Sequence, residues 1–226
     1  MLDPALKAFQ ARVEKEAAMI KLYSWTTPNG RKVSIALEEM GLEYEAVAVD
    51  IGKDEQFAPA FLKISPNNRI PAITDGDVAL FESGAILMYL AEKSGKFMPT
   101  YGSDQYWKMM QWLMWQMGGF GPMLGQAHHF LKYNAGKSEY SEARFHTEAN
   151  RLYGVLDRHL ATSPYIIDEL SIADFSIWPW ASRFEWHQVD IDAYPNVKRW
   201  YLELAARPGF QRGYKVPKDV GDVPLA

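Results

Sequence analysis

The sequence contains no cysteine among its 226 residues, and this absence excludes several kinds of site at once. Structural disulfides, thiolate-ligated metals and a cysteine nucleophile all need a sulfur that the chain does not have. The absence fits a reducing compartment, so we expect a cytoplasmic protein. Long apolar runs are also missing, since none reaches the ~18 residues of a membrane-spanning helix. The formal net charge of −4 argues against general affinity for nucleic acid or acidic lipid, so we expect partners of neither kind.

Residues 1–18 lack the apolar core of a secretory signal peptide, because charged residues such as Lys7, Arg12 and Glu16 interrupt them. Pro4 suits a first helical turn after Asp3 as the cap. Apolar residues recur at helical intervals and are Leu2, Leu6, Phe9 and Val13. We predict an amphipathic helical extension that docks on a neighbouring domain or a second subunit, with a solvated extension as the alternative.

Residues 19–95 alternate between strand and helix patterns. Gly41 ends a helical pattern, and Asp75-Gly76-Asp77 marks a hairpin turn between two strands. The order β-α-β-α-β-β-α predicts a thioredoxin-like domain. The expected strands span residues 19–23, 44–49, 70–74 and 78–81, and the expected helices span residues 31–40, 57–64 and 82–92.

Residues 96–103 read as a linker, and residues 103–206 show helical patterns without strands. Ser171 and Asp174 have the spacing of a capping box at a helix start. Glycines and prolines in residues 207–226 predict an irregular tail. The fold class is therefore α/β plus all-α. The expected helices span residues 104–117, with a bend or break at residues 118–122, and residues 138–160, 171–187 and 195–206.

Three motifs in the first domain could form a binding site. Thr27-Pro28-Asn29-Gly30 fits a helix start, with Thr27 as the cap and Pro28 in the first turn. Ile70-Pro71, which follows Ser65-Pro66-Asn67-Asn68, places a proline at the head of a strand. Glu82-Ser83 begins a helix, where free N–H groups and the helix dipole suit a carboxylate. Simple helix capping is the alternative interpretation for the first and third motifs.

Together these motifs resemble the glutathione transferase family over residues 19–207, and Thr27-Pro28-Asn29-Gly30 is similar to its bacterial Nu class. The resemblance implies a homodimer with glutathione as co-substrate, bound as one or two molecules or as glutathione disulfide. It continues through Trp115-Gln116, Gly121-Pro122-Met123-Leu124-Gly125-Gln126, His128-His129-Phe130 and Trp178-Pro179-Trp180.

The resemblance also implies roles for individual residues. Thr27 and Asn29 would face the glutathione sulfur as catalytic residues, with Ser24 and Thr26 as hydroxyl alternatives to Thr27. Glutathione itself would be bound by Gln56, Ile70, Pro71, Glu82, Ser83 and Arg144, and the Ile70–Pro71 bond would be cis. Candidates for a second-substrate pocket, or otherwise for the helical core, are Trp25, Trp115, Met117, Phe120, Met123 and Trp180.

His128 and His129 do not indicate a metal, because adjacent helix residues point ~100° apart and chelate poorly together. No P-loop or dinucleotide fingerprint is present. The residues and the resemblance therefore favour an enzyme that uses glutathione to reduce the disulfide bond of a small molecule. Conjugation or thiolytic cleavage of aromatic electrophiles or peroxides is an alternative, and a non-catalytic glutathione-binding regulator is another.

Thiolate chemistry limits what Thr27 and Asn29 could contribute. A thiol with a pKa near 8.5 is about 3 % thiolate at pH 7, so full ionisation would gain about 30-fold. Lowering the pKa by about two units would cost about eightfold in nucleophilicity. The net gain is about fourfold, so holding the sulfur against its reaction partner must supply more of the rate.

Overall fold

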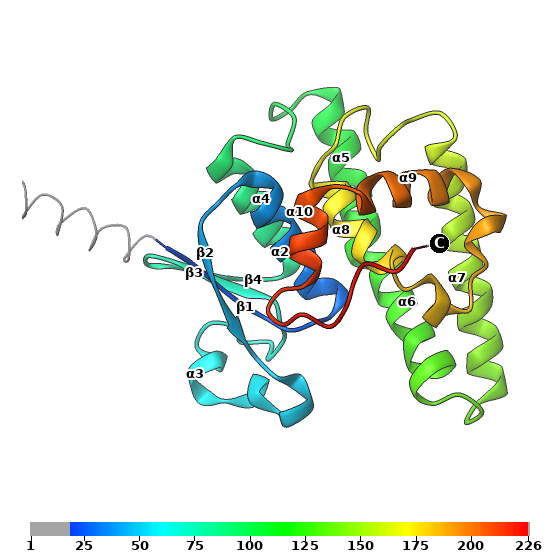
Figure 1. The fold of residues 1–226 in the computed structure, drawn as a ribbon, viewed down its shortest axis with the longest axis horizontal. Coiled ribbons are helices and arrows are strands. Elements are labelled where there is room, and N and C mark those ends of the chain that lie inside the picture. Colours follow the sequence, from blue (N-terminus) through cyan, green and yellow to red (C-terminus); the bar gives the residue numbers. More distant parts are fainter. Residues whose placement is uncertain (1–18, 226) are drawn as a thin grey trace, which may run out of the picture.

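The computed structural model describes residues 19–225, so the predicted helix within residues 1–18 lies outside the described residues. A lobe built on a sheet packs against a helical lobe (Figure 1). This arrangement confirms the predicted fold class.

The sheet has the strand order β2-β1-β3-β4. The first pair, β1 and β2, is parallel and places Ile20 opposite Tyr44, whereas the other two pairs are antiparallel. The strands are β1 (Ile20–Ser24), β2 (Tyr44–Ala48), β3 (Ala72–Asp75) and β4 (Val78–Phe81), which lie within a residue or two of the predicted ranges.

Helices cover both faces of this sheet. On one face, α2 (Pro28–Met40) and α4 (Ser83–Ser94) bury Leu22 and Ile73 in the main core (Figure 1). On the other, Phe61 of the short α3 (Pro59–Leu62) packs with Val49 and Ala72. Strand side chains alternate between faces, which explains why neighbours Ala72 and Ile73 belong to different clusters. Gly41 ends α2 at φ 70°, as the sequence predicts.

The second lobe is all-helical within the described residues. The predicted bend or break at residues 118–122 coincides with a wide π-turn at Gln116–Phe120, so the helix is irregular there but does not break. A second π-turn follows at His128–Tyr133. Pro122 lies in the first turn of α6, directly after the first π-turn. The helices are α5 (Asp104–Trp115), α6 (Gly121–Ala127), α7 (Glu139–Leu160), α8 (Ile172–Ala181), α9 (Pro195–Ala205) and α10 (Pro208–Tyr214).

A capping box begins α8, as predicted. The Ser171 hydroxyl accepts from the Ala173 N–H at 3.3 Å, and the Asp174 carboxylate accepts from the Ser171 N–H at 3.0 Å. The helix ends at Ala181, earlier than predicted. The Ser182 hydroxyl, just beyond the end, donates a hydrogen bond to the Pro179 carbonyl at 2.8 Å. A separate 3₁₀ turn follows at Phe184–His187.

The segment predicted as an irregular tail contains α10, which lies against α2 (Figure 1). Gly213 allows this contact, because a Cβ there would overlap the backbone of Ile35. The Ser34 hydroxyl donates to the Gly213 carbonyl at 2.6 Å, and the Arg31 guanidinium lies 3.5 Å above the Tyr214 ring. Glycine therefore serves close packing here, whereas the sequence pattern suggested a chain breaker.

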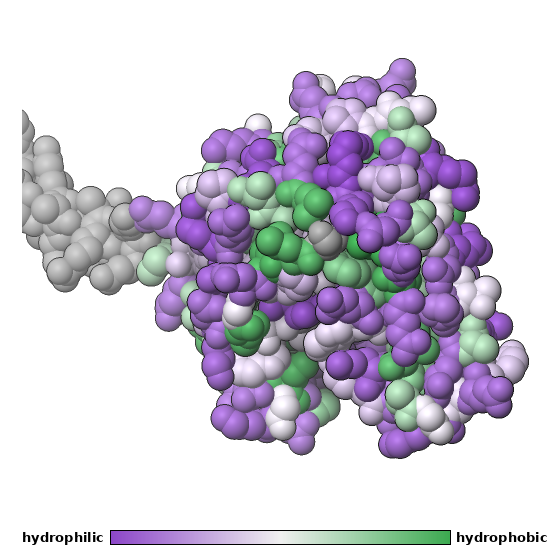
Figure 2. Space-filling view, turned by 45° about the vertical axis from the view of Figure 1, so that its right-hand side comes forward, coloured by the Kyte–Doolittle hydropathy of each residue, from purple (hydrophilic) through white to green (hydrophobic). Residues whose placement is uncertain are grey.

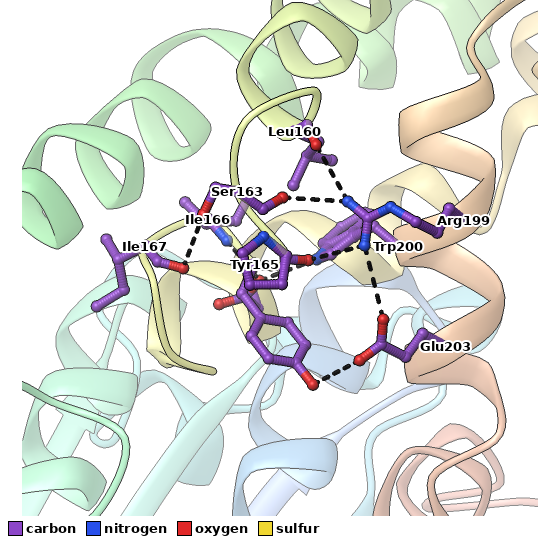
Figure 3. Close-up of polar contacts among 10 residues, drawn as sticks. Leu160, Ser163, Tyr165, Ile166, Ile167, Arg199, Trp200 and Glu203 are labelled. Carbon is purple, nitrogen blue, oxygen red and sulfur yellow. Dashed lines mark hydrogen bonds and ion pairs between the residues drawn. The ribbon is translucent and has the colours of Figure 1, made fainter.

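Arg199 of α9 binds the C-terminal end of α7 and the loop after it (Figure 3). Its guanidinium donates to the carbonyls of Leu160 and Ser163 at 3.1 Å each. Glu203 lies 3.6 Å from the same guanidinium and accepts from the Tyr165 hydroxyl at 2.6 Å. A cation at a helix C-terminus satisfies carbonyls that have no partner within the helix.

Hydrophobic side chains on the surface form small patches within a largely hydrophilic face (Figure 2). Across residues 19–225, every helix is too short or too polar to cross a membrane.

Candidate active site

Two neighbouring cavities open where α2 and α4 begin, beside the loop that leads into β3. The Ser83 cavity has a volume of about 450 Å³ and the Thr27 cavity about 480 Å³. They share three lining residues, Asn29, Arg69 and Ile70. The Ser83 cavity is also lined by Asn67, Pro71, Phe81, Glu82, Ser83, Met117 and Pro122, and the Thr27 cavity by Thr27, Pro28, Ile51, Gln56, Asn68, Gly125, His128, Tyr133 and Trp180.

Thr27 caps α2 and lines the Thr27 cavity. Its Oγ1 accepts from the Gly30 N–H at 3.2 Å, and its extended backbone (φ −111°, ψ 161°) is that of a cap. A hydroxyl that accepts one bond still has a proton to donate. Ser24 is fully buried beneath the turn, and neither Ser24 nor Thr26 lines the two cavities. Of the three hydroxyls, the geometry therefore favours Thr27 for contact with a ligand.

Asn29 lies between the two cavities with its amide orientation fixed. The Trp180 indole N–H donates to its Oδ1 at 2.9 Å. Because an indole can only donate, the amide oxygen faces Trp180 and the NH₂ group is left to donate elsewhere. Trp180 was predicted as a pocket residue, and it both lines the Thr27 cavity and orients Asn29.

The Ile70–Pro71 bond is cis, as predicted. The β1–β3 pairing stops at Ala72, so Ile70 lies beyond the last paired residue and on the wall shared by both cavities. The preceding loop is held by Ser65, whose hydroxyl donates to the Arg69 carbonyl at 2.8 Å.

Glu82 and Ser83 are not helix caps in the usual sense. Glu82 precedes α4 without a side-chain cap bond, and Ser83 is the first residue of the helix. Both line the Ser83 cavity. The Ser83 hydroxyl accepts from the Lys32 ammonium at 3.2 Å. The capping alternative therefore does not explain this motif.

Two amide oxygens at the Thr27 cavity are buried without a hydrogen-bond partner. They are Gln56 Oε1, on the short 3₁₀ turn Glu55–Phe57, and Asn68 Oδ1, whose residue has φ 52°. Buried polar atoms normally have partners, so an unpaired pair at one cavity marks a place for a ligand's donors. Gln56 was predicted from the resemblance, whereas Asn68 was not.

Sequence reasoning also missed Arg69 and His128. Arg69 is an exposed cation on the shared wall, and its place directly before Ile70-Pro71 could have indicated it. The His128 ring is 6 % exposed and stacks on His187 at 4.6 Å, and its Nε2 has no partner. Burial, aided by the Arg183 charge, lowers the pKa of His128 to about 4, so the imidazole is neutral at pH 7.

The remaining candidates are dispersed. Phe120 is fully buried and stacks on Trp115 at 4.9 Å in the helical core, and Trp25 lines neither cavity. Met117 lines the Ser83 cavity. Arg144 and Met123 line a separate hollow of about 610 Å³ beside α7, which shares no residue with the two cavities. In residues 19–225 no group of side chains has the arrangement of a metal site.

Comparison with known proteins supports the resemblance found in the motifs. The family models "Glutathione S-transferase, N-terminal domain" and "Glutathione S-transferase, C-terminal domain" match residues 18–92 and 139–203. The chain is 46 % identical over 198 residues to the disulfide-bond oxidoreductase YfcG of Escherichia coli K12. The aligned region covers 84 % of this chain and 92 % of that protein.

Solved structures of similar proteins share the fold. A glutathione transferase from Pseudomonas putida, with one glutathione disulfide bound per subunit, has a TM-score of 0.84 at 44 % identity, over 88 % of this chain and 92 % of that one. A Pseudomonas fluorescens family member with two glutathione molecules bound has a TM-score of 0.85 at 44 % identity, over 89 % and 94 %. With both domains matched and the site motifs gathered at two cavities, the chain belongs to the glutathione transferase family.

Proposed function

We propose that this protein is a glutathione-dependent disulfide reductase whose reacting thiolate comes from glutathione. The observation that carries the proposal is the pair of adjacent cavities that meet at Asn29. Two neighbouring sites with a common wall suit two tripeptides, or one glutathione disulfide, whose sulfurs meet beside that amide. The similar structures from Pseudomonas hold ligands of these two kinds, and YfcG is named for disulfide chemistry.

The γ-glutamyl end of the first glutathione fits the Ser83 cavity, and the molecule extends past Ile70 into the Thr27 cavity. Its γ-glutamyl carboxylate binds at Ser83, where the start of α4 offers free N–H groups, and its ammonium binds Glu82. Its cysteinyl backbone pairs with Ile70, which the sheet leaves unpaired. The Gln56 amide binds the glycyl end from the Thr27 cavity. Arg144 contacts neither cavity, so its role stays a prediction from the family resemblance.

The reaction has two exchange steps. The glutathione thiolate attacks one sulfur of a disulfide, forming a mixed disulfide and releasing the other sulfur as a thiolate that takes up a proton. A second glutathione thiolate attacks the glutathione sulfur of the mixed disulfide and releases the second thiol. Two glutathiones and one disulfide thus give glutathione disulfide and two thiols. Thr27 and Asn29 hold the attacking sulfur through a hydroxyl proton and an oriented amide NH₂.

Reduction of bis(hydroxyethyl) disulfide by excess glutathione tests the proposal. We expect clear turnover above the uncatalysed rate, and a loss of about tenfold in kcat/KM for Asn29→Ala, because one charge-stabilising donor is removed. Thr26→Ala is the matched control, since Thr26 lies in the same turn but lines neither cavity. Turnover no faster than the uncatalysed reaction would refute the proposal.

The same assay separates the alternatives. Chlorodinitrobenzene turnover far above disulfide turnover would indicate conjugation as the main activity. A biological function that survives in Asn29→Ala and Thr27→Ala, while turnover is lost, would indicate a glutathione-binding regulator.

We also propose a homodimer, formed through exposed apolar side chains of β4 and α5. Large apolar side chains are exposed on these elements, namely Val78, Phe81, Trp107 and Met114. Phe81 also lines the Ser83 cavity, so we expect the site to lie near the interface. Light scattering in solution should give twice the 25.8 kDa chain mass, and a monomer would contradict the dimer.

The absence of cysteine fits the cytoplasm, which fractionation of cells would test.

A further inference from the structure

Lys32 is a buried lysine that contacts only neutral groups. It lies on α2, is 1 % exposed, and its Nζ donates to Gln116 Oε1 at 2.7 Å and to Ser83 Oγ at 3.2 Å. Met117 Sδ lies 3.6 Å away as a weak acceptor. A buried ammonium normally requires an opposite charge, because desolvation disfavours the charged form. Among residues 19–225, no carboxylate lies within salt-bridge distance of Lys32.

The charged groups on the surrounding elements do not supply this counter-charge. Glu82, ahead of α4, acts on Lys32 only at a distance and raises the pKa of Lys32 less than burial lowers it. Arg31, the neighbour on α2, is a second cation and cannot be the counter-charge. Its guanidinium donates to the Tyr214 carbonyl of α10 at 3.0 Å. On α8, which also packs on α2, the Asp174 carboxylate is taken up by the donors of its own capping box. The net result is that the pKa of Lys32 is lowered to about 7.

Lys32 lies directly behind the Ser83 cavity. Ser83 and Met117 both contact the ammonium, and both line that cavity. The Ser83 hydroxyl accepts from Lys32 and donates to Met117 Sδ at 3.6 Å, a weak acceptor that a carboxylate entering the cavity would replace. A carboxylate bound there would be hydrogen-bonded to Ser83 and would lie near the ammonium.

We propose that Lys32 is a positioning residue for the ligand's carboxylate, with the Ser83 hydroxyl between them, and that carboxylate binding is coupled to proton uptake by Lys32. The coupling depends on the proposed function, because it assigns the γ-glutamyl carboxylate to this cavity. An arriving negative charge stabilises the ammonium, and the charged ammonium in turn strengthens binding. Ligands without this carboxylate would gain nothing from Lys32.

Calorimetry of S-methylglutathione binding in buffers of different ionisation enthalpy tests this coupling. The blocked sulfur removes the proton that a thiol would release. From a free pKa of about 7, we expect uptake of about half a proton at pH 7 and about 0.9 at pH 8, with affinity falling as the pH rises through this range. Binding without proton uptake at pH 8 would overturn the proposal. Failure of S-methylglutathione to bind at all would instead contradict the proposed function.

Two variants make the test specific. Lys32→Met should weaken S-methylglutathione binding about 10- to 100-fold and abolish proton uptake, because a charged hydrogen bond is lost. Lys32→Arg should abolish proton uptake as well, since arginine stays charged, and it decides the matter if the Met variant does not fold.

A second ligand separates coupling from general structural damage. The analogue with 4-aminobutyryl in place of γ-glutamyl lacks the carboxylate, and we expect Lys32→Met to change its affinity less than twofold. An equal loss for both ligands would show that Lys32 merely supports the fold.

Discussion

Two helix caps with similar chemistry, Thr27 before α2 and Ser171 before α8, differ in the hydrogen bonds that their surroundings offer. Ser171 is 1 % exposed, and its hydroxyl both accepts from the Ala173 N–H and donates to the Asp174 carboxylate at 3.1 Å. Thr27 accepts from the Gly30 N–H, and its proton is free beside a cavity. A cap completed within the chain therefore serves the fold, whereas a cap with a free donor is available to a ligand.

The same contrast holds for the surroundings of each cap. Around α8, the Asp174 carboxylate accepts hydrogen bonds from Ile166, Ser171 and Trp200 at 2.9–3.1 Å. Around α2, the unpaired atoms include Gln56 Oε1 and His128 Nε2. Substitutions in the first region should therefore change stability, and substitutions in the second should change activity or, at His128, the pH dependence of stability.

The largest expected effect is on stability, at Asp174. Asp174→Ala removes the acceptor for three buried N–H groups, so we expect the free energy of unfolding to fall by about 3–5 kcal/mol in urea titrations. Activity per folded molecule should stay within about twofold. Asp174→Asn, which keeps one acceptor oxygen, should recover about half of the loss. A stability change below about 1 kcal/mol would contradict this account of the α8 cap.

A smaller effect should come from pH, through His128. The unfolded imidazole binds a proton below about pH 6.5, but the folded one only near pH 4, so the unfolded chain binds more protons between these values. The free energy of unfolding should therefore fall on acidification from pH 7 to pH 5, by about 2 kcal/mol from this group. His128→Gln should lack this component. Asp174 acts in the opposite direction, since burial raises its pKa to about 6, but it is common to both proteins and cancels in their difference.

Parallel denaturation of the wild type and His128→Gln at the two pH values measures this component. Equal pH dependence in the two proteins would show that His128 is protonated normally in the folded state.

The smallest effect, and the sharpest comparison, comes from exchanging cap chemistry at the two positions. Thr27→Asp keeps a capping oxygen but has no proton to donate, so stability should stay within about 0.5 kcal/mol while kcat/KM falls at least about tenfold. Ser171→Ala should do the reverse, losing about 1 kcal/mol of stability with normal kcat/KM. Thr27→Ser, which keeps both functions of the hydroxyl, should retain both. If Thr27→Asp remained fully active, the Thr27 proton would have no part in the reaction.

The sequence was most informative where a residue's backbone role and site role coincide. Thr27 and Pro28 are recognisable as a helix start, and Ser171 with Asp174 as a capping box, because these contacts are local along the chain. The cis Ile70–Pro71 bond was predicted from the family resemblance. Local signals of this kind give the order of elements and most of their bounds.

Contacts between distant residues could not be predicted in this way. Lys32 meets Gln116 across 84 positions, and Asn29 meets Trp180 across 151. Nothing near Lys32 in the sequence marks it as buried, since it follows Arg31 in a helix start of ordinary composition. The α10 helix was missed for the same reason, because packing on Ile35 supports a segment that its glycines would otherwise weaken.

The contact between α10 and α2 also bears on how the protein is made. The first lobe does not have all its partners until residues near Gly213 have been synthesised, since Ile35 and Ser34 bind them directly. On a ribosome adding about 5–20 residues per second, α2 therefore emerges many seconds before its partner helix. During that interval the side of α2 that α10 later covers, at Ser34 and Ile35, has no partner from α10. Completion of the glutathione-binding lobe thus waits for the synthesis of α10.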